Sequence, residues 1–267
     1  MAINDEPPER DPAPAVTRSI KILGLLADAH GRALALSDIA RSIGAAKSST
    51  SNLCVVLEDH GLIQRRDSGF ILGRRTVELG GAYIASFDQV REFYRLCLEA
   101  PLLSHELVQI AVLDGTDVLY LARHEGRAPL RLSASIGDRF PAASTAVGNA
   151  LLSLLPLEEI AARFSTPSAF VQRTDRSTAN LSQLQAKLEL VRERGYAIDD
   201  GEVHPGVYGI AMIIPPRGSG EPPLAIGASL VESSGADEVR EGVIAELRHV
   251  ISQLANPLMT GRNRPAH

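Results

Sequence analysis

The chain has 267 residues, of which 45% are hydrophobic, and a formal net charge of −5. This length is enough for two domains with separate apolar cores. The sequence contains no run of about 18 apolar residues, so it predicts no membrane-spanning helix. Its two cysteines are typical of a protein from a reducing compartment. We therefore expect a cytoplasmic protein with no membrane partner.

Charge is distributed unevenly along the chain. Residues 1–14 combine four acidic residues, one arginine and four prolines and lack the apolar stretch of a signal peptide, so we expect a disordered tail. Residues 15–80 carry nine basic and six acidic residues, whereas residues 81–267 carry 17 and 22. A positive segment within an acidic chain favours a nucleic-acid contact confined to that segment.

Two short helices joined by a tight turn are predicted within residues 36–60. Apolar residues recur at helical spacing over Ser37–Ile43, where Ser37 is expected to cap the helix N-terminus. Gly44 follows at the position where a left-handed residue usually ends a helix. A second helix is predicted over Ala46–His60. This order is typical of a helix-turn-helix, which reads double-stranded DNA.

An upstream helix and a β-hairpin complete this unit. The hairpin, or wing, is predicted over Gln64–Leu72 with its turn at Asp67–Gly69. Three short helices can bury one small core. The residues expected to form that core are Val16, Ile20, Leu23 and Ala27 of the upstream helix and Leu53, Val56 and Leu57 of the second helix-turn-helix helix.

The opposite face of the second helix is polar. Ser48–Ser51 are poor helix formers, but small polar side chains at a helix N-terminus allow close approach to DNA. Asn52 suits a two-point contact to adenine, and the wing arginines suit phosphate contacts. The alternative is that this polarity is ordinary solvated surface. The candidate DNA-binding residues are Arg18, Lys47, Ser48, Ser49, Ser51, Asn52, Arg65 and Arg66.

The rest of the chain mixes helices and strands. A helical linker is predicted over Arg75–Leu98, and the Asp114–Asp117 turn between two apolar runs predicts a hairpin. Because strands and helices do not alternate strictly, the expected class is α+β with an antiparallel sheet. The further predicted strands are Leu130–Ser133, Ala197–Asp199, Ile210–Ile214 and Leu224–Val231. The further predicted helices are Ala143–Leu155, Leu157–Phe164, Leu181–Arg194 and one from about Glu238 to Leu254.

Nine segments, in order from about Val16 to Leu254, resemble the IclR-type bacterial transcriptional regulators. They are VTRSIKILGLLAD, LSDIARSIG, KSSTSNL, LEDHGLIQR, FILGRRTVELGGAYIAS, VLDGTDVLYLAR, TAVGNALLS, RERGYAIDDGEVHPGVYGIA and LAIGASL. The resemblance implies a winged helix-turn-helix domain over 15–75, a linker helix over 76–98 and a GAF-like effector-binding domain over 99–256, with a flexible tail over 257–267. It also implies a homodimer or dimer of dimers that binds operator DNA as a repressor or activator.

The resemblance further implies a pocket for a small organic acid. Backbone N–H groups at the start of the predicted Thr145–Ser153 helix could hold a carboxylate. Gly209 and Gly227 stand where the family often has Cys and Ser, so we expect a roomier, less polar pocket that suits an aromatic or bulkier acid. The effector-binding residues carried over by motif are Leu130, Ala146, Val147, Asp199, Val207, Gly209, Gly227 and Ser229.

The alternative is a small-molecule-binding module or an enzyme with no sequence-specific DNA role. The chain has no G-x-S-x-G, Walker loop or complete G-x-G-x-x-G. Asp199 and Asp200 are consecutive on a predicted strand and so point to opposite faces. We expect His105, His124 and His204 at the surface or hydrogen-bonded, without metal-ligand spacing. We therefore expect no catalytic residue, cofactor or metal.

Overall fold

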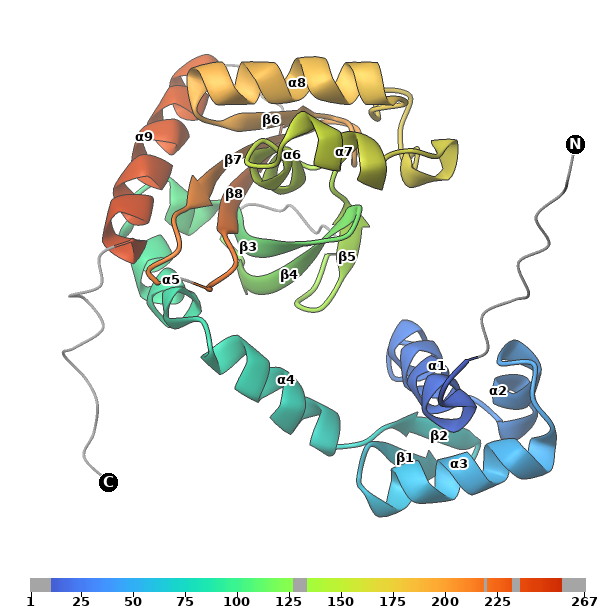
Figure 1. Cartoon of the computed structure of the whole chain (residues 1–267). Coiled ribbons are helices and arrows are strands. Elements are labelled where there is room, and N and C mark those ends of the chain that lie inside the picture. Colours follow the sequence, from blue (N-terminus) through green and yellow to red (C-terminus); the bar gives the residue numbers. More distant parts are fainter. Residues whose placement is uncertain (1–10, 127–133, 219, 232–235, 256–267) are drawn as a thin grey trace, which may run out of the picture. The chain divides into compact units, whose positions relative to one another are not determined.

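The computed structural model describes residues 11–126, 134–218, 220–231 and 236–255 (Figure 1). The chain divides into two compact units, Met1–Ser86 and Phe87–His267. Within the described ranges, no helix is both long enough and apolar enough to cross a membrane.

The first unit is a winged helix-turn-helix, as predicted. Its core includes Ile22, Ile39, Cys54 and Phe70. Its elements are α1 (Pro14–Asp28), α2 (Leu36–Ser42), α3 (Lys47–Asp59), β1 (Ile63–Arg66), β2 (Gly69–Leu72) and α4 (Arg75–Ala85).

The turn between α2 and α3 is partly as predicted. Gly44 has a φ of +65°, which confirms the left-handed residue after α2. The capping role of Ser37 is wrong. Ala35 is the extended residue before the helix, so α2 begins at Leu36 and Ser37 already lies within its first turn. Pro14, which was predicted to end the disordered tail, is the first residue of α1.

The predicted buried faces of α1 and α3 are also partly wrong. Val16 and Ile20 are 58% and 63% exposed, whereas Ile22 and Leu26 are buried. On α3, Val56 is likewise exposed and Cys54 is buried. Both helices carry apolar residues on more than one face, so two stripes compete in the sequence. The position of the neighbouring elements decides which stripe is covered.

The wing has a third backbone segment that the sequence pattern did not reveal. β1 and β2 pair antiparallel around a two-residue turn. Leu34 also pairs with Phe70, each backbone N–H donating to the other's carbonyl at 2.9 Å. Gly69 has a φ of +150°, and a Cβ there would lie 2.1 Å from the Leu34 carbonyl oxygen. Only glycine therefore fits at this position.

The predicted single linker helix is two helices. α4 ends at Ala85, and α5 runs from Asp88 to Glu99. Phe87 between them has extended backbone angles (φ −106°, ψ 97°) and a buried ring. Apolar spacing continues across this break, so periodicity alone cannot detect one residue that leaves the helical conformation.

The second unit contains a six-stranded antiparallel sheet with the order β5-β4-β3-β8-β7-β6, which confirms the predicted class. Helices α6 and α8 pack on one face of the sheet, and α5 and α9 pack on the other (Figure 1). The strands are β3 (Leu107–Asp114), β4 (Asp117–His124), β5 (Arg139–Pro141), β6 (Ala197–Asp200), β7 (Val207–Ile214) and β8 (Leu224–Val231). The helices after α5 are η1 (Leu103–His105), α6 (Ala146–Leu152), α7 (Leu157–Arg163), η2 (Pro167–Ala169), α8 (Leu181–Arg194) and α9 (Ala236–Leu254).

Turn and cap residues were predicted well in this unit. Asp114 lies opposite Asp117 across the β3–β4 hairpin, with Gly115 at a φ of +66°. α8 has the predicted bounds, and Gly195 closes it at a φ of +79°. β5 was missed because it is short and contains Pro141, and proline argues against a strand. The strand predicted over Leu130–Ser133 lies outside the described residues.

Candidate DNA-binding surface and effector pocket

The N-terminal half of α3 presents the candidate base-reading residues. Lys47 is the first residue of α3. Ser48, Ser49 and Asn52 are exposed, and Ser51 is half-buried. Thr50 between them is buried, and its hydroxyl donates to the Ala46 carbonyl at 3.0 Å. The serine-rich stretch therefore combines one side chain that anchors the helix start with several that face outward.

The two wing arginines differ in their surroundings. Arg66 is exposed. The Arg65 backbone N–H donates to Glu58 at 3.2 Å, and its guanidinium Nε lies 3.6 Å from the same carboxylate. The Arg65 guanidinium also lies 4.5 Å from the Phe70 ring centroid. Arg65 therefore helps to hold the wing against α3, so contact with a DNA phosphate would compete with its bond to Glu58.

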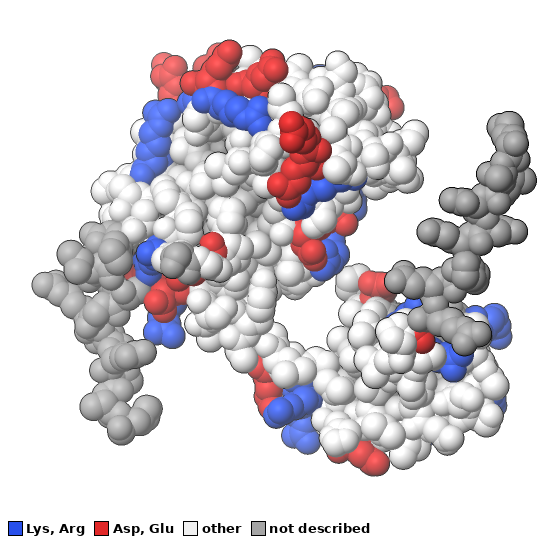
Figure 2. Space-filling view, viewed as in Figure 1, with Lys and Arg blue, Asp and Glu red and all other residues white. Residues whose placement is uncertain are grey.

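On the face of the first unit that Figure 2 shows, the basic side chains are dispersed. Arg18 is exposed on α1. Figure 2 shows the Lys and Arg side chains of the first unit as separate groups on the visible face, not as one continuous patch.

In the second unit a cavity lies between α6, the sheet and the loop after β6. Seven of the eight predicted effector-binding residues line it; Leu130 lies outside the described residues. The seven are Ala146, Val147, Asp199, Val207, Gly209, Gly227 and Ser229. The structure thus brings together residues from α6, β6, β7 and β8 that are up to 83 positions apart in the sequence.

The two cavity glycines do not make the pocket roomier, contrary to our expectation. A Cβ at Gly227 would lie 2.8 Å from Val147 Cγ1. A Cβ at Gly209 would lie 3.2 Å from the Cβ of Asp199 and 3.3 Å from that of Ala146. The neighbouring side chains occupy the space that larger residues would take. These glycines therefore let α6 lie close to the sheet.

An aromatic wall of the cavity was missed in the sequence. The Phe140 ring lies 5.6 Å from the Tyr120 ring and 6.2 Å from the His204 ring, centroid to centroid, and all three residues line the cavity. Burial raises the pKa of the Tyr120 hydroxyl, so it stays protonated. The Arg173 guanidinium lies 4.5 Å from the Phe140 ring centroid. Neither Tyr120 nor Phe140 belongs to a motif that singles it out.

Asp199 is the acidic residue of the cavity lining and is 8% exposed. The pKa of Asp199 is raised to about 7, chiefly by burial; the Glu202 N–H opposes this shift, the Glu202 carboxylate adds to it, and Lys187 opposes it. Asp200 is exposed and pairs with Arg176 at 3.2 Å. The prediction that the two aspartates face opposite sides is thus confirmed, and of the two only Asp199 lines the cavity.

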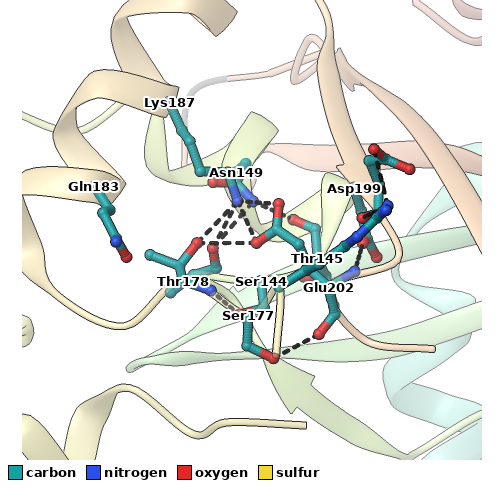
Figure 3. Close-up of polar contacts among 12 residues, drawn as sticks. Ser144, Thr145, Asn149, Ser177, Thr178, Gln183, Lys187, Asp199 and Glu202 are labelled. Carbon is teal, nitrogen blue, oxygen red and sulfur yellow. Dashed lines mark hydrogen bonds and ion pairs between the residues drawn. The ribbon is translucent and has the colours of Figure 1, made fainter. Parts of the chain in front are cut away.

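A buried ion pair lies behind Asp199. Figure 3 shows Lys187 reaching from α8 to Glu202, with Thr178 beside the pair. Lys187 Nζ lies 2.6 and 2.7 Å from the two Glu202 oxygens and donates to Thr178 Oγ1 at 3.0 Å and to the Ala143 carbonyl at 3.2 Å. Burial lowers the pKa of Lys187, and Glu202 opposes that shift. The pair therefore ties α8 to the segments that carry two walls of the cavity.

The start of α6 is partly capped from within the chain. Thr145 Oγ1 accepts the Gly148 N–H at 3.1 Å. That N–H group is therefore not free for a ligand carboxylate, which limits the predicted role of this helix start.

Two of the three histidines differ from expectation. His105 is exposed, with Nδ1 2.9 Å from the Pro101 carbonyl, as predicted. His124 and His204 each have a buried Nε2 with no partner among the described residues. His204 lines the cavity, and burial lowers its pKa, with Arg173 adding to the shift. His204 lies within a segment that resembles the family, but a single histidine gives no signal of such an environment.

A winged helix-turn-helix joined to an α+β unit with a lined cavity defines a ligand-responsive DNA-binding protein. Residues 15–67 match the IclR helix-turn-helix domain, and residues 82–256 match the bacterial transcriptional regulator IclR C-terminal family. The chain therefore belongs to the IclR family of bacterial transcriptional regulators, which are not enzymes.

Relatives of known description agree with this assignment. The HTH-type transcriptional regulator XynR of Escherichia coli strain K12 is 27% identical over 254 residues, covering 94% of this chain and 98% of XynR. The Agobacterium tumefaciens repressor BlcR is 32% identical, with a TM-score of 0.58 over 94% of this chain and 99% of BlcR. An IclR homologue from Microbacterium hydrocarbonoxydans, complexed with 4-hydroxybenzoate, shares the fold at 22% identity and a TM-score of 0.70, covering 88% and 99% of the two chains.

Proposed function

We propose that this protein binds a DNA operator through α3 and the wing and that a small organic acid in the second unit changes its affinity for that operator. One observation carries the proposal: seven residues that match the family's pocket pattern line one cavity in a chain that also carries a helix-turn-helix. Such a regulator acts where the bacterial chromosome lies, in the cytoplasm, and needs no catalytic residue, metal or cofactor.

The working form in this proposal is a homodimer or a dimer of dimers. Within the described chain, α4 has no buried residue and exposes Val77, Leu79 and Tyr83. A second copy that covers these side chains would remove apolar surface from water. A dimer would place two α3 helices in successive major grooves, about 34–36 Å apart or a multiple of that.

The proposed ligand is an aromatic or similarly bulky carboxylic acid. The Tyr120–Phe140 wall suits an aromatic ring. The cavity lining contains no lysine or arginine among the described residues. The carboxylate would therefore be held by neutral donors, such as Ser229 and the protonated Asp199. The 4-hydroxybenzoate bound to the Microbacterium homologue supports an acid of this class.

Regulation would follow if the protein adopts two arrangements that differ in their affinity for DNA and also in their affinity for the ligand. A ligand can shift operator occupancy only by that difference, commonly about 1–3 kcal/mol. α4 and α5 join the two units along the chain. This segment would therefore couple ligand binding in the second unit to DNA binding in the first. Asp199→Ala should spare binding to the operator and change the response to ligand.

The experiment is a selection of genomic DNA fragments retained by the protein, followed by sequencing. Recovery of a near-palindromic site supports the proposal, and genes beside that site suggest the effector. The recovered site is then titrated with the protein in the presence of benzoate or 4-hydroxybenzoate. Retention of no sequence above random DNA would contradict the operator role and favour the binding-module alternative.

A further inference from the structure

Gln109 is a polar residue in the buried strand β3. The strand reads LVQIAVLD, and Gln109 is 5% exposed. Its side chain lines the cavity, and its Nε2 has no hydrogen-bond partner among the described residues. It lies opposite Gly227 of β8, and directly opposite residues of an antiparallel pair share a face. Gln109 therefore faces α6 and the cavity.

The fold gains little from this amide. A buried donor without a partner loses the hydrogen bonds that water would provide, and an apolar residue of the same length would avoid that loss. A ligand oxygen placed against the amide would restore the missing bond. In the ligand-free protein the unpaired Gln109 donor therefore lowers stability. A ligand that accepts a hydrogen bond from it would remove that loss.

Gln109 and Asp199 approach the cavity from opposite ends. The four strands lie in the order β3-β8-β7-β6, with Gln109 on the first and Asp199 on the last. Three strand spacings amount to roughly 14 Å between their backbones. Val147, which packs against Gly227 of β8, and Val207 of β7 line the cavity between these ends. A ligand that reaches both groups needs two polar ends and an apolar body.

We propose that Gln109 is a specificity-determining residue that binds a second oxygen of the effector, at the end remote from its carboxylate. This inference rests on the proposed function, in which the cavity holds an organic acid near Asp199. It narrows the ligand class to acids that carry a hydroxyl or carbonyl oxygen across an apolar body. An acid that lacks the second oxygen leaves the amide unpaired and binds less tightly.

The ligand test compares benzoate with 4-hydroxybenzoate, which differ by one hydroxyl group, by calorimetry on the full-length protein. We expect the wild type to bind 4-hydroxybenzoate at least tenfold more tightly than benzoate, and Gln109→Met to bring the ratio of the two affinities close to one. A ratio that Gln109→Met leaves unchanged overturns this inference alone. A wild type that binds neither acid overturns the aromatic ligand of the proposed function as well.

The second test needs no ligand. We expect Gln109→Met to leave the Tm of the ligand-free protein equal or higher, because the Gln109 Nε2 has no hydrogen-bond partner in the part of the chain that the structure describes. Gln172→Met is the control with a partnered amide: Gln172 is exposed, its Nε2 donates to the Thr178 carbonyl at 2.9 Å, and the Tm of this variant should fall. A fall in Tm for Gln109→Met as large as that of the control shows a structural role and overturns the inference. Gln109→Leu serves as the second variant of the same test.

Discussion

The backbone N–H of Glu202 donates to Asp199 Oδ1 at 2.7 Å, which joins the cavity carboxyl directly to the residue that forms the buried ion pair with Lys187. Burial, more than any single neighbour, raises the pKa of Asp199 to about 7. The protonation state of this carboxyl is therefore sensitive to pH near neutrality, and two consequences can be measured.

Asp199→Asn should make stability less dependent on pH. The pKa of Asp199 rises from 3.8 to about 7 on folding, so the folded state holds the proton more tightly. The stabilisation that this tighter proton binding gives to the folded state is present in full below about pH 4. It is lost as the pH rises through 7. The asparagine variant should therefore be more stable than wild type at pH 8, by thermal unfolding, with the difference shrinking toward pH 5. Parallel wild-type and variant curves would show that Asp199 is ionised throughout.

Binding of an acid effector should take up a proton near pH 7.5. A ligand carboxylate close to an ionised Asp199 would place two negative charges in a cavity whose described lining has no lysine or arginine. Affinity for 4-hydroxybenzoate should fall as the pH rises above 7, and calorimetry in buffers of different ionisation enthalpy should report the uptake. Asp199→Asn is the control, and it should bind without this pH dependence. Uptake of no proton by the wild type would place the carboxylate away from Asp199.

Lys187→Met should destabilise the second unit by about 3 kcal/mol, because it leaves the Glu202 carboxylate buried without its partner. This expected loss is at the lower end for breaking a buried ion pair, because the Lys187 and Glu202 side chains are 24% and 11% exposed. Arg176→Met removes the exposed pair with Asp200 and is the control, with an expected loss below about 1 kcal/mol. Urea unfolding measures both variants, and equal losses would contradict a special role for Lys187.

Much of the fold could be predicted from the sequence where local chemistry decides it. Gly195 after α8 and Gly115 in the β3–β4 hairpin mark their turns because few other residues adopt a positive φ. Burial could not be predicted as well. α1 is apolar on two sides, so the exposure of Val16 and the burial of Ile22 depend on tertiary packing.

The residues of the candidate pocket also include some that the sequence could predict and some that it could not. Asp199 and Val147 belong to segments that resemble a family and were found for that reason. Gln109 and Phe140 lie outside every segment that resembles the family, and the sheet brings them to the cavity. His204 lies within such a segment, but nothing in that segment marks it as a cavity residue. Gln109 still left a signal, because it is the one polar residue within the apolar run from Leu107 to Leu113.

Gly69→Ala should weaken both the first unit and its DNA binding. Its Cβ would overlap the Leu34 carbonyl, so the bridge between Leu34 and Phe70 would have to break. We expect a loss above about 2 kcal/mol in unfolding free energy, since backbone strain and a lost pair add together. Gly115→Asn is the control, because a positive φ is tolerated by Asn and the site is open. A Gly69→Ala protein as stable as wild type would show that the wing can shift away from Leu34.

Asn52→Ala and Lys47→Ala should separate base reading from phosphate binding on α3. Asn52 is exposed on the helix face expected to meet base edges, so its loss should relax sequence preference, at a cost of about 1–3 kcal/mol on the operator and little on random DNA. Lys47→Ala removes one positive charge and should weaken binding to operator and random DNA alike. It should also reduce the slope of log affinity against log salt concentration by about one. Fluorescence anisotropy on both DNAs at several salt concentrations measures these effects. If both variants weaken operator and random DNA to the same extent, Asn52 contacts the backbone and base reading must lie elsewhere on α3 or in the wing.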